Sequence, residues 1–226
     1  MRGLFVTGTG TGVGKTIVSA ALLAAIRATG EPVRAHKPVV TGLAEPPPGG
    51  WPPDHELLAL AAGMAPEEVS PLRFNPPVSP HFAASLAGQS IDPANVVAAA
   101  RAGLQDTLVV EGVGGLLVPI AERFSVRDLA VELGLPILIA ARTDLGTINH
   151  TLLTLDAARA VGLEVRAVVL TPWPSDPSVI ERSNSETIER LGAVEVCHLP
   201  HITDPSLSGL ARAGERLPFK RWLSFC

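Results

Sequence analysis

The sequence predicts an α/β protein with a doubly wound, mostly parallel sheet and helices on both faces. Two observations carry this prediction. Short runs of Leu, Ile and Val show no polar alternation, which is typical of strands buried on both faces. Segments with helical periodicity separate these runs, and this order favours parallel strands joined by crossover helices. The length of 226 residues predicts a single domain, residues 1–226.

The elements expected in the first half follow from apolar runs, helical spacing and chain breakers. In order, they are a strand at Leu4–Thr7, a helix at Lys15–Thr29, a strand at Val33–His36, a loop without regular structure through the prolines of 46–53, a helix capped by Asp54 and reaching Ala62, and an irregular stretch at 63–90. Five prolines interrupt that last stretch.

The second half continues the alternation. The expected elements are a helix at Asp92–Ala102, a strand at Thr107–Glu111, a short apolar piece at Leu116–Ile120, a helix capped by Ser125 and reaching Leu133, a strand at Ile137–Ala141, a helix at Thr147–Val161, a strand at Val165–Thr171, a helix at Ser178–Leu191 and a strand at Val194–Leu199. Ligands of such sheets bind at the carboxyl ends of the strands, so functional residues are expected there.

Composition and charge narrow the function classes. Hydrophobic residues make up 46% and charged residues 18% of the chain, which excludes a disordered protein. A formal net charge of -4 without a basic stripe disfavours a nucleic acid or an anionic membrane as partner. Cys197 and Cys226 are too few for a disulfide scaffold and fit a reducing compartment. With no apolar run of about 18 residues and no signal-peptide core, we expect a cytoplasmic protein.

The segment from Gly8 to Thr16 predicts a phosphate-binding loop. Its glycines let backbone N–H groups turn toward phosphate oxygens, and the following helix presents its positive end. Lys15 is expected to reach the β- and γ-phosphates, and the Thr16 hydroxyl to bind Mg²⁺. The usual spacing has a glycine five residues before Gly14, where this chain has Thr9, so the loop is a lengthened variant. These features predict a sheet of the P-loop nucleotide-hydrolase type.

Three charged residues are expected beside this loop. Glu111 ends its strand at the point where a nucleotide site needs an acid for the metal ion. Lys37 follows the second strand, and only three of the 18 basic residues are lysines, which favours a specific role over a solvated one. Asp54 is either a helix cap or a second metal carboxylate, or both.

These residues, together with further segments of the chain, resemble the family of ATP-dependent dethiobiotin synthetases. The matching segments are Val6–Thr16, His36–Val39, Ser79–His81, Val110–Gly115, Gly146–Thr151 and Leu199–Pro200, in order along nearly the whole chain. The pieces at Lys37–Val39 and Ile148–His150 are the most specific, and the lengthened phosphate loop looks like this family's own version.

The resemblance implies an ATP- and Mg²⁺-dependent cyclo-ligase that closes the ureido ring of dethiobiotin. One amine of 7,8-diaminopelargonic acid (7,8-diaminononanoate) takes up CO₂ as a carbamate, and a carbamate oxygen attacks the γ-phosphate of ATP. The second amine attacks the resulting carbamic–phosphoric anhydride, closes the ring and expels phosphate, while ADP is the other product. No covalent enzyme nucleophile is required.

The resemblance also implies residue roles in this chain. The expected catalytic residues are Lys37, Lys15 and Thr11, with Lys37 between the carbamate and the γ-phosphate. The expected metal ligands are Thr16, Asp54 and Glu111. The expected nucleotide contacts are Gly12, Val13, Gly14, Lys15, Thr16, Ile17, Asp54, Glu111, Gly112, Val113, Gly114, Thr171, Pro200, His201 and Ile202. The expected substrate contacts are Thr41, Gly146, Thr147, Ile148 and Asn149.

The residues alone favour a plain interface or surface helix at Gly146–Asn149, whereas the resemblance implies a homodimer whose sites are completed across the interface. Gly146–Asn149 opens a helix, and the free N–H groups of a helix start are a ready carboxylate site. The diamine substrate carries a carboxylate far from its amines. In the family the neighbouring subunit contributes this helix start, so the resemblance assigns it the carboxylate.

The chain departs from the family pattern at three positions. Gly10 stands where the family usually has Asp, and Thr41 where it commonly has Ser. Thr171 falls where the family has an adenine-reading Asn, so the resemblance does not settle the base preference.

Two alternative functions stay open at this point. A partitioning-type ATPase switch has the same core, although it would carry a lysine early in the loop and none precedes Lys15 there. An amide-forming ligase of the same fold would want a glutamine-hydrolysing domain, for which this chain has no room.

Overall fold

The computed structural model describes residues 2–45, 50–102 and 106–224, and its main feature is a six-stranded sheet with the order β10-β9-β8-β1-β5-β2. All neighbouring strands in this sheet are parallel. The strands are β1 (Gly3–Gly8), β2 (Val33–His36), β5 (Thr107–Glu111), β8 (Ile137–Ala141), β9 (Val165–Trp173) and β10 (Glu195–Pro200). The predicted parallel sheet is confirmed.

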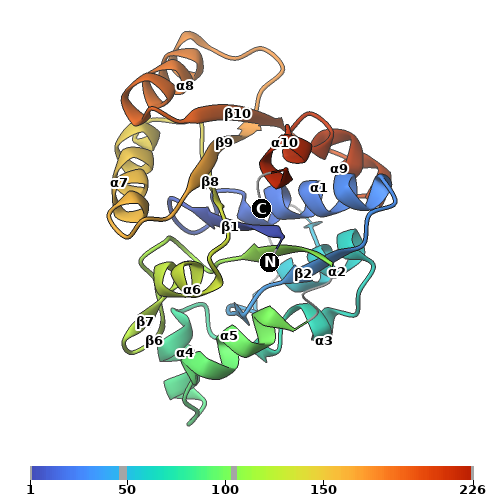
Figure 1. The fold of residues 1–226 in the computed structure, drawn as a ribbon, viewed down its shortest axis with the longest axis vertical. Coiled ribbons are helices and arrows are strands. Elements are labelled where there is room, and N and C mark those ends of the chain that lie inside the picture. Colours follow the sequence, from blue (N-terminus) through green and yellow to red (C-terminus); the bar gives the residue numbers. More distant parts are fainter. Residues whose placement is uncertain (1, 46–49, 103–105, 225–226) are drawn as a thin grey trace.

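Helices cover both faces of the sheet (Figure 1). One face carries α1 (Lys15–Ala28), α2 (Asp54–Ala62), α9 (Leu207–Gly214) and α10 (Phe219–Leu223). The other carries α4 (Pro80–Leu86), α5 (Pro93–Arg101), α6 (Val126–Leu133), α7 (Thr147–Arg159) and α8 (Val179–Gly192). Within β1, Leu4 and Val6 pack into the first layer and Phe5 into the second. This period of two, with both faces buried, is why the strands read as continuous apolar runs.

The strand order places a switch point at β1. From β1 the chain reaches β2 at one edge and returns to β5 beside β1, whereas β8, β9 and β10 extend the sheet on the other side. Connections therefore diverge around the carboxyl end of β1, and a crevice opens there in sheets of this kind. The loop after β1 is the glycine-rich segment that the sequence singles out.

Two stretches differ from the sequence-based expectation. Residues 63–90 are not wholly irregular, because they contain α3 (Pro66–Val69), β4 (Leu72–Arg73) and α4, and β4 pairs in parallel with β3 (Val39–Val40). Pro66 and Pro80 begin their helices, since the first helical position needs no N–H donor. The apolar piece at 116–120 is not one strand either: β6 (Pro119–Ala121) pairs antiparallel with β7 (Phe124–Ser125). Beyond β10, α9 and α10 have no counterpart in the prediction.

The proline-rich loop is only partly covered. Residues 46–49 of the predicted loop 46–53 lie outside the described residues. The structure describes Trp51 and Pro52, which line cavities beside the phosphate loop.

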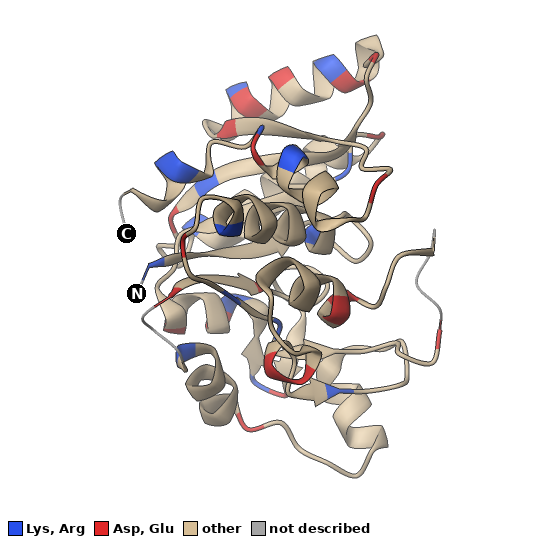
Figure 2. Ribbon diagram, turned by 90° about the vertical axis from the view of Figure 1, so that its right-hand side faces the viewer, with Lys and Arg blue, Asp and Glu red and all other residues tan. Residues whose placement is uncertain are grey.

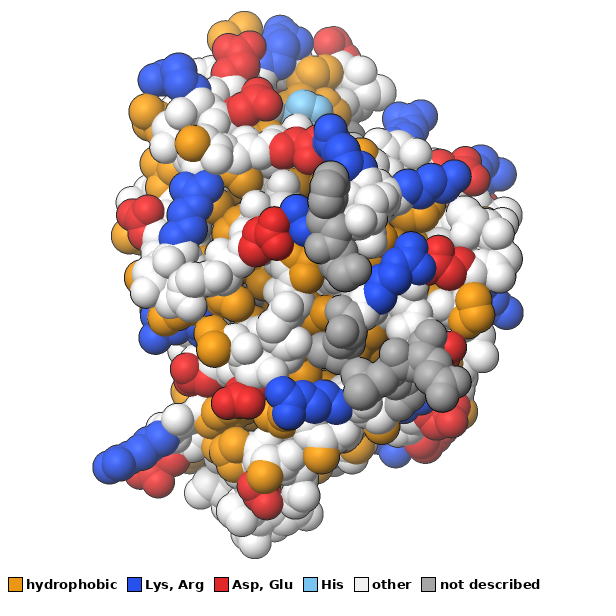
Figure 3. Space-filling model, in the orientation of Figure 1, with side chains coloured by type: hydrophobic (Ala, Val, Ile, Leu, Met, Phe, Trp, Pro, Cys, Tyr) orange, Lys and Arg blue, Asp and Glu red, His pale blue; other side chains and the backbone are white. Residues whose placement is uncertain are grey.

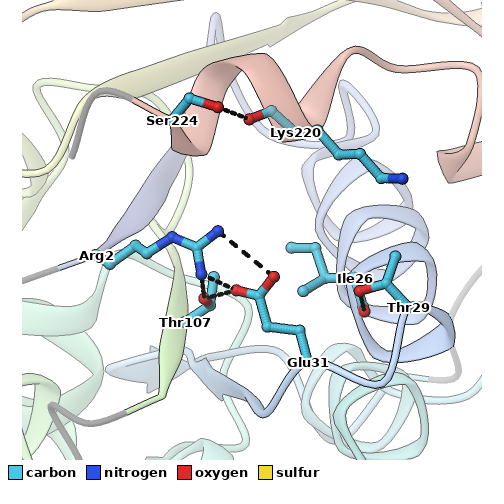
Figure 4. Close-up of polar contacts among 7 residues, drawn as sticks. All are labelled: Arg2, Ile26, Thr29, Glu31, Thr107, Lys220 and Ser224. Atoms are coloured by element: carbon cyan, nitrogen blue, oxygen red, sulfur yellow. Dashed lines mark hydrogen bonds and ion pairs between the residues drawn. The ribbon is translucent and has the colours of Figure 1, made fainter.

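The opposite edge of the sheet, at the amino ends of the strands, is joined by a polar cluster (Figure 4). Arg2 donates to the Thr107 hydroxyl at 3.1 Å and pairs with Glu31, which links the beginnings of β1, β5 and β2. Lys220, the lysine that follows neither a strand nor the glycine loop, lies exposed on α10 near this cluster. Its position separates it from the crevice that holds the other two lysines.

The surface carries charges of both signs. Acidic and basic residues are spread along the chain in Figure 2, and their side chains are interspersed on the face drawn in Figure 3. Among the described residues, no helix is long and apolar enough to cross a bilayer.

Candidate active site

The phosphate loop lies between β1 and α1, and close packing fixes its shape. Gly12 and Gly14 have φ of 70° and 92°, a region that disfavours side chains. A Cβ on Gly14 would lie 2.5 Å from Cγ2 of Thr171, so only glycine fits where the loop passes the end of β9. The Lys15 ammonium donates to the Gly10 carbonyl at 2.8 Å, and Nη2 of Arg142 donates to the Gly12 carbonyl at 3.1 Å. The side chains of Lys15, at the end of the loop, and Arg142, far along the chain, thus each bind a backbone carbonyl of the loop.

A charged cluster lies beside this loop. The Lys37 ammonium donates to Oε1 of Glu111 at 2.6 Å and also pairs with Oδ2 of Asp54. The Thr16 hydroxyl donates to the same Oε1 of Glu111 at 2.8 Å. The side chains of Lys37 and Glu111 are 4% and 1% exposed, whereas that of Asp54 is 46% exposed. The cluster therefore has a buried floor and one carboxylate that opens to solvent.

Sheet register explains how Lys37 and Glu111 meet. β2 and β5 are neighbours, with His36 opposite Val110, so Lys37 and Glu111 follow at the same edge. The Lys37 backbone N–H donates to the Val69 carbonyl at 2.8 Å, which holds the residue after its strand has ended. The prediction that Lys37 lies on the same edge of the sheet as the phosphate loop is confirmed, because both line one cavity.

Asp54 does not cap its helix. Pro53 occupies the cap position, and Asp54 is the first residue of α2. Its carboxylate turns instead to the Lys37 ammonium. A charged partner binds a carboxylate more strongly than a neutral backbone N–H does, which explains the choice. The cap interpretation of Asp54 is therefore wrong.

The two lysines of the site have opposite pKa shifts. Burial, with the nearby charge of Lys37, lowers the pKa of Lys15 from 10.5 to about 8. Burial would lower the pKa of Lys37 too, but the carboxylates of Asp54 and Glu111 overcome it and raise the pKa above its usual value. Burial opposes ionisation of Asp54, yet its pairing with Lys37 lowers its pKa overall. Among the described residues Lys15 forms no direct ion pair, since its ammonium donates to the Gly10 carbonyl, and phosphate oxygens are the groups that would supply one.

This imbalance predicts that Lys15→Met stabilises the nucleotide-free protein. A pKa of about 8 in the folded chain against 10.5 corresponds to at most about 3 kcal/mol that folding loses at neutral pH. Because the folded pKa is lowered, the penalty is complete below about pH 8 and disappears as the pH rises toward 10.5. Urea unfolding should show the variant more stable at neutral pH, with a smaller difference at alkaline pH. A variant that is less stable at both pH values would contradict this account.

Thr16, Asp54 and Glu111 fit a Mg²⁺ ion by their chemistry. All three offer hard oxygen donors, and Mg²⁺ commonly takes one or two carboxylates together with substrate phosphates and water. Oε2 of Glu111 is buried and has no hydrogen-bond partner among the described residues, so it is available to a ligand. In that same part of the chain, no group of three or more His, Cys, Asp and Glu side chains is arranged to hold a metal ion by itself. The site therefore fits a metal ion that arrives with phosphate ligands.

Two cavities meet at the phosphate loop. The larger, of about 660 Å³, contains Lys15, Thr16, Lys37 and Asp54, and extends to Thr41. The smaller, of about 390 Å³, lies on the other side of the loop. Gly12, Gly14, Ile17 and Trp51 line both. The arrangement suits a ligand whose phosphates lie on the loop, with its base on one side and a reacting partner on the other.

The structure brings most of the predicted site residues together. The larger cavity is lined by Thr11, Gly12, Gly14, Lys15, Thr16, Ile17, Lys37, Thr41, Asp54, Val113 and Gly114. The smaller is lined by Gly12, Val13, Gly14, Ile17, Thr171, Pro200, His201 and Ile202. Glu111 lies beneath the larger cavity in contact with Lys37, and Gly112 follows it, where a Cβ would approach Val126 to 2.7 Å.

The predicted carboxylate site does not join this group within one chain. Gly146, Thr147, Ile148 and Asn149 begin α7 and line neither cavity in the described part of the chain. Gly146 and Asn149 are exposed, and the Thr147 hydroxyl donates to the Arg142 carbonyl at 2.6 Å.

Sequence reasoning missed several lining residues, of which four stand out. Arg142, Thr143 and Asp144 follow β8 and form a wall of the smaller cavity, and Trp51 lies between the two cavities. The rule that ligands bind after strand ends would have found the first three. Trp51 offers a weaker signal, as an aromatic side chain within a stretch of prolines and glycines.

A glycine loop at the switch point of a parallel sheet, with lysines and metal-binding oxygens beside it, defines a P-loop protein that handles a nucleotide's phosphates. Residues 2–206 match a family described as an AAA domain. The chain is 44% identical over 207 residues to an ATP-dependent dethiobiotin synthetase of Anaeromyxobacter dehalogenans, covering 89% of this chain and 86% of the relative. It is 38% identical over 200 residues to one from Bacillus velezensis, covering 87% and 84%.

The chain belongs to the family of ATP-dependent dethiobiotin synthetases. The resemblance drawn from the sequence is confirmed, and with it the expectation of an ATP-dependent ligase of biotin synthesis. A biotin biosynthesis bifunctional protein of Bordetella avium is 45% identical over 200 residues, which are 86% of this chain and 38% of that protein.

Proposed function

We propose that this chain, as a single domain of residues 1–226, closes the ureido ring of dethiobiotin from 7,8-diaminopelargonic acid, CO₂ and ATP. The observation that carries the proposal is the 660 Å³ cavity, which holds the phosphate loop, Lys37 and Asp54 in one space. Ring closure needs a carbamate beside a γ-phosphate, and the phosphate loop with Lys15 and Lys37 supplies positive charge for both. Family membership supports the same reaction.

The chain's own residues act by holding charge. Lys15 would neutralise the phosphoryl group that passes from ATP to the carbamate oxygen. Lys37 would bind the carbamate and the γ-phosphate together, which aligns two anions that otherwise repel. Thr11 and Thr41, in the same cavity, would donate hydroxyl hydrogen bonds to the reactants. The second amine then displaces phosphate from the anhydride carbon.

We propose Mg²⁺ as the metal, held by Thr16, Asp54 and Glu111. When bound, it would neutralise charge on the β- and γ-phosphates. The two protein carboxylates would keep it at the loop, and Glu111, buried beneath Lys37, would supply the fixed ligand.

The nucleotide base is assigned to the 390 Å³ cavity. Ile17 would cover one side of the base, and Pro200, His201 and Ile202 the other. Val113 and Gly114, beyond Gly112, would border the phosphates from the larger cavity.

Base discrimination is expected to be loose in this cavity. A site that hydrogen-bonds a specific edge rejects analogues strongly, because the rejected pairing leaves buried polar groups unpaired. Thr171 is buried and offers a single hydroxyl where the family has an Asn. Turnover with ATP, GTP and CTP should therefore agree within about tenfold. A strong preference for ATP would show that backbone groups or another side chain read the base.

The reaction itself can be traced with oxygen isotopes. Enzyme mixed rapidly with ATP, the diamine and C¹⁸O₂ should release phosphate that carries one ¹⁸O, because the attacking carbamate oxygen leaves with the phosphoryl group. Dethiobiotin should form in equal amount by mass spectrometry. ATP hydrolysis that needs neither diamine nor CO₂, with unlabelled phosphate, would overturn the proposal and point to an ATPase switch.

We also propose a cytoplasmic homodimer, with Gly146–Asn149 of one subunit completing the site of the other. Leu145, just before this helix start, is 94% exposed, and Leu153 on the same helix is 58% exposed. Exposed apolar side chains flanking a polar helix start are what an interface between subunits would cover. The thiol of Cys197 is free, which suits a reducing compartment.

Subunit mixing is expected to restore activity between two inactive parents. One parent carries Lys37→Gln, and the other carries Thr147→Pro with Asn149→Asp, which repels a carboxylate. A heterodimer then holds one intact site, so random mixing in equal amounts should regain about a quarter of the wild-type activity. Asp156→Asn, an exposed change on the same helix, is the matched control. Heterodimers that form without regaining activity would show that each site is built within one chain.

A further inference from the structure

The ammonium of Lys37 lies where the proposed metal ligands converge. It is 2.6 Å from Oε1 of Glu111 and is bonded to Oδ2 of Asp54, and the third ligand, the Thr16 hydroxyl, is 2.8 Å from that same Oε1. An ammonium binds oxygens at about 2.8 Å and Mg²⁺ binds them at about 2.1 Å. Because the carboxylate oxygens of Glu111 and Asp54 would bind either cation, the ammonium and the metal ion would occupy the same place between them.

The charges of Lys37, Asp54 and Glu111 allow only one cation between the two carboxylates. Asp54 and Glu111 contribute two negative charges and Lys37 one positive charge. A divalent ion placed between the carboxylates with Lys37 still there would put two cations in contact beside Glu111, whose side chain is 1% exposed, so their repulsion is only partly screened by water.

We propose that Lys37 and the metal ion share one site: Lys37 holds the two carboxylates in the nucleotide-free protein, and the metal ion displaces its ammonium when it enters with the nucleotide. The displaced ammonium then faces the larger cavity, where the carbamate and γ-phosphate would lie. This inference rests on the metal part of the proposed function.

The chain allows this movement of the side chain without movement of the backbone. The Lys37 backbone N–H donates to the Val69 carbonyl at 2.8 Å, and Pro38 restricts the backbone conformation of Lys37, which precedes it. The side chain has four flexible carbons and lines the larger cavity. Lys15 is not an equivalent cation, because its ammonium is bonded to the Gly10 carbonyl rather than to a carboxylate.

Metal binding without nucleotide tests the proposal directly. Mn²⁺ binding to the nucleotide-free protein is measured by electron paramagnetic resonance for the wild type, Lys37→Met and Lys15→Met. Lys37→Met should bind Mn²⁺ at least tenfold more tightly than the wild type, because its carboxylates have no resident cation. Lys15→Met controls for general loss of positive charge and should bind less than threefold more tightly. Equal tightening in both variants, or none in Lys37→Met, would overturn the proposal.

A second variant covers the case in which Lys37→Met does not fold. Lys37→Arg keeps the charge and the ion pairs, and its guanidinium holds both carboxylates with more donors. It should bind Mn²⁺ at least tenfold more weakly than the wild type without nucleotide, and unchanged binding would contradict the shared site. Adding ADP separates the two proposals. If the wild type binds no Mn²⁺ even with ADP, the metal site itself is wrong; if it binds with ADP and the variants do not differ without it, only the shared site is wrong.

Discussion

Lys37→Arg is expected to lower dethiobiotin formation by about 10²–10³-fold, the loss typical when a group that stabilises developing charge is removed. Lys37 is buried between Glu111 and Asp54, and its compact charge must serve two anions of the reactants. A planar guanidinium pairs with the carboxylates but does not fit as a point charge between carbamate and phosphate. The phosphate loop is unchanged, so the nucleotide still binds.

Product formation at saturating Mg²⁺, together with calorimetric titration by ADP, measures both parts of this expectation. Lys220→Arg makes the same exchange at the exposed lysine on α10 and should leave both quantities unchanged. Lys37→Arg activity within a few-fold of the wild type would show that Lys37 takes no part in the reaction. Loss of ADP binding together with activity would show a structural role instead.

Glu111→Gln and Asp54→Asn are expected to weaken Mg²⁺-dependent turnover, Glu111→Gln more strongly than Asp54→Asn. Glu111 is buried, shares one oxygen with Thr16 and Lys37, and has a second oxygen without a partner among the described residues. The charge of its carboxylate has no substitute, so its loss should raise the Mg²⁺ concentration for half-maximal rate by more than about tenfold. Asp54 is 46% exposed, so water replaces part of its contribution and the effect should be smaller.

The measurement is the rate as a function of Mg²⁺ concentration at fixed ATP. Glu56→Gln, an exposed carboxylate on the same helix as Asp54, is the control and should leave the curve unchanged. A larger effect for Asp54→Asn than for Glu111→Gln would reverse the assignment of the fixed ligand. Thermal unfolding of each variant separates metal binding from stability, because Glu111→Gln also removes a partner of the buried Lys37.

The sequence alone determined the sheet and the phosphate loop. Their signals are local: apolar runs with both faces buried, helical spacing between them, and glycines followed by Lys15. The positions of Glu111 and Lys37 beside the loop were also predictable, because the carboxyl ends of parallel strands lie at one edge of a sheet. The family motifs then named the chemistry, and the comparisons bear out that family.

Only the tertiary structure decided which side chains pair. Asp54 looks like a helix cap in the sequence, but Lys37, 17 positions away, draws its carboxylate. The Lys37–Glu111 pair spans 74 positions and the Arg142–Gly12 contact 130, and no local pattern encodes separations of that size. The free energy of a buried ion pair depends on distance and burial, which exist only once strands and helices have packed. For this reason the sequence placed a lysine and two carboxylates near a phosphate loop, while packing decided that the lysine occupies the place between the carboxylates.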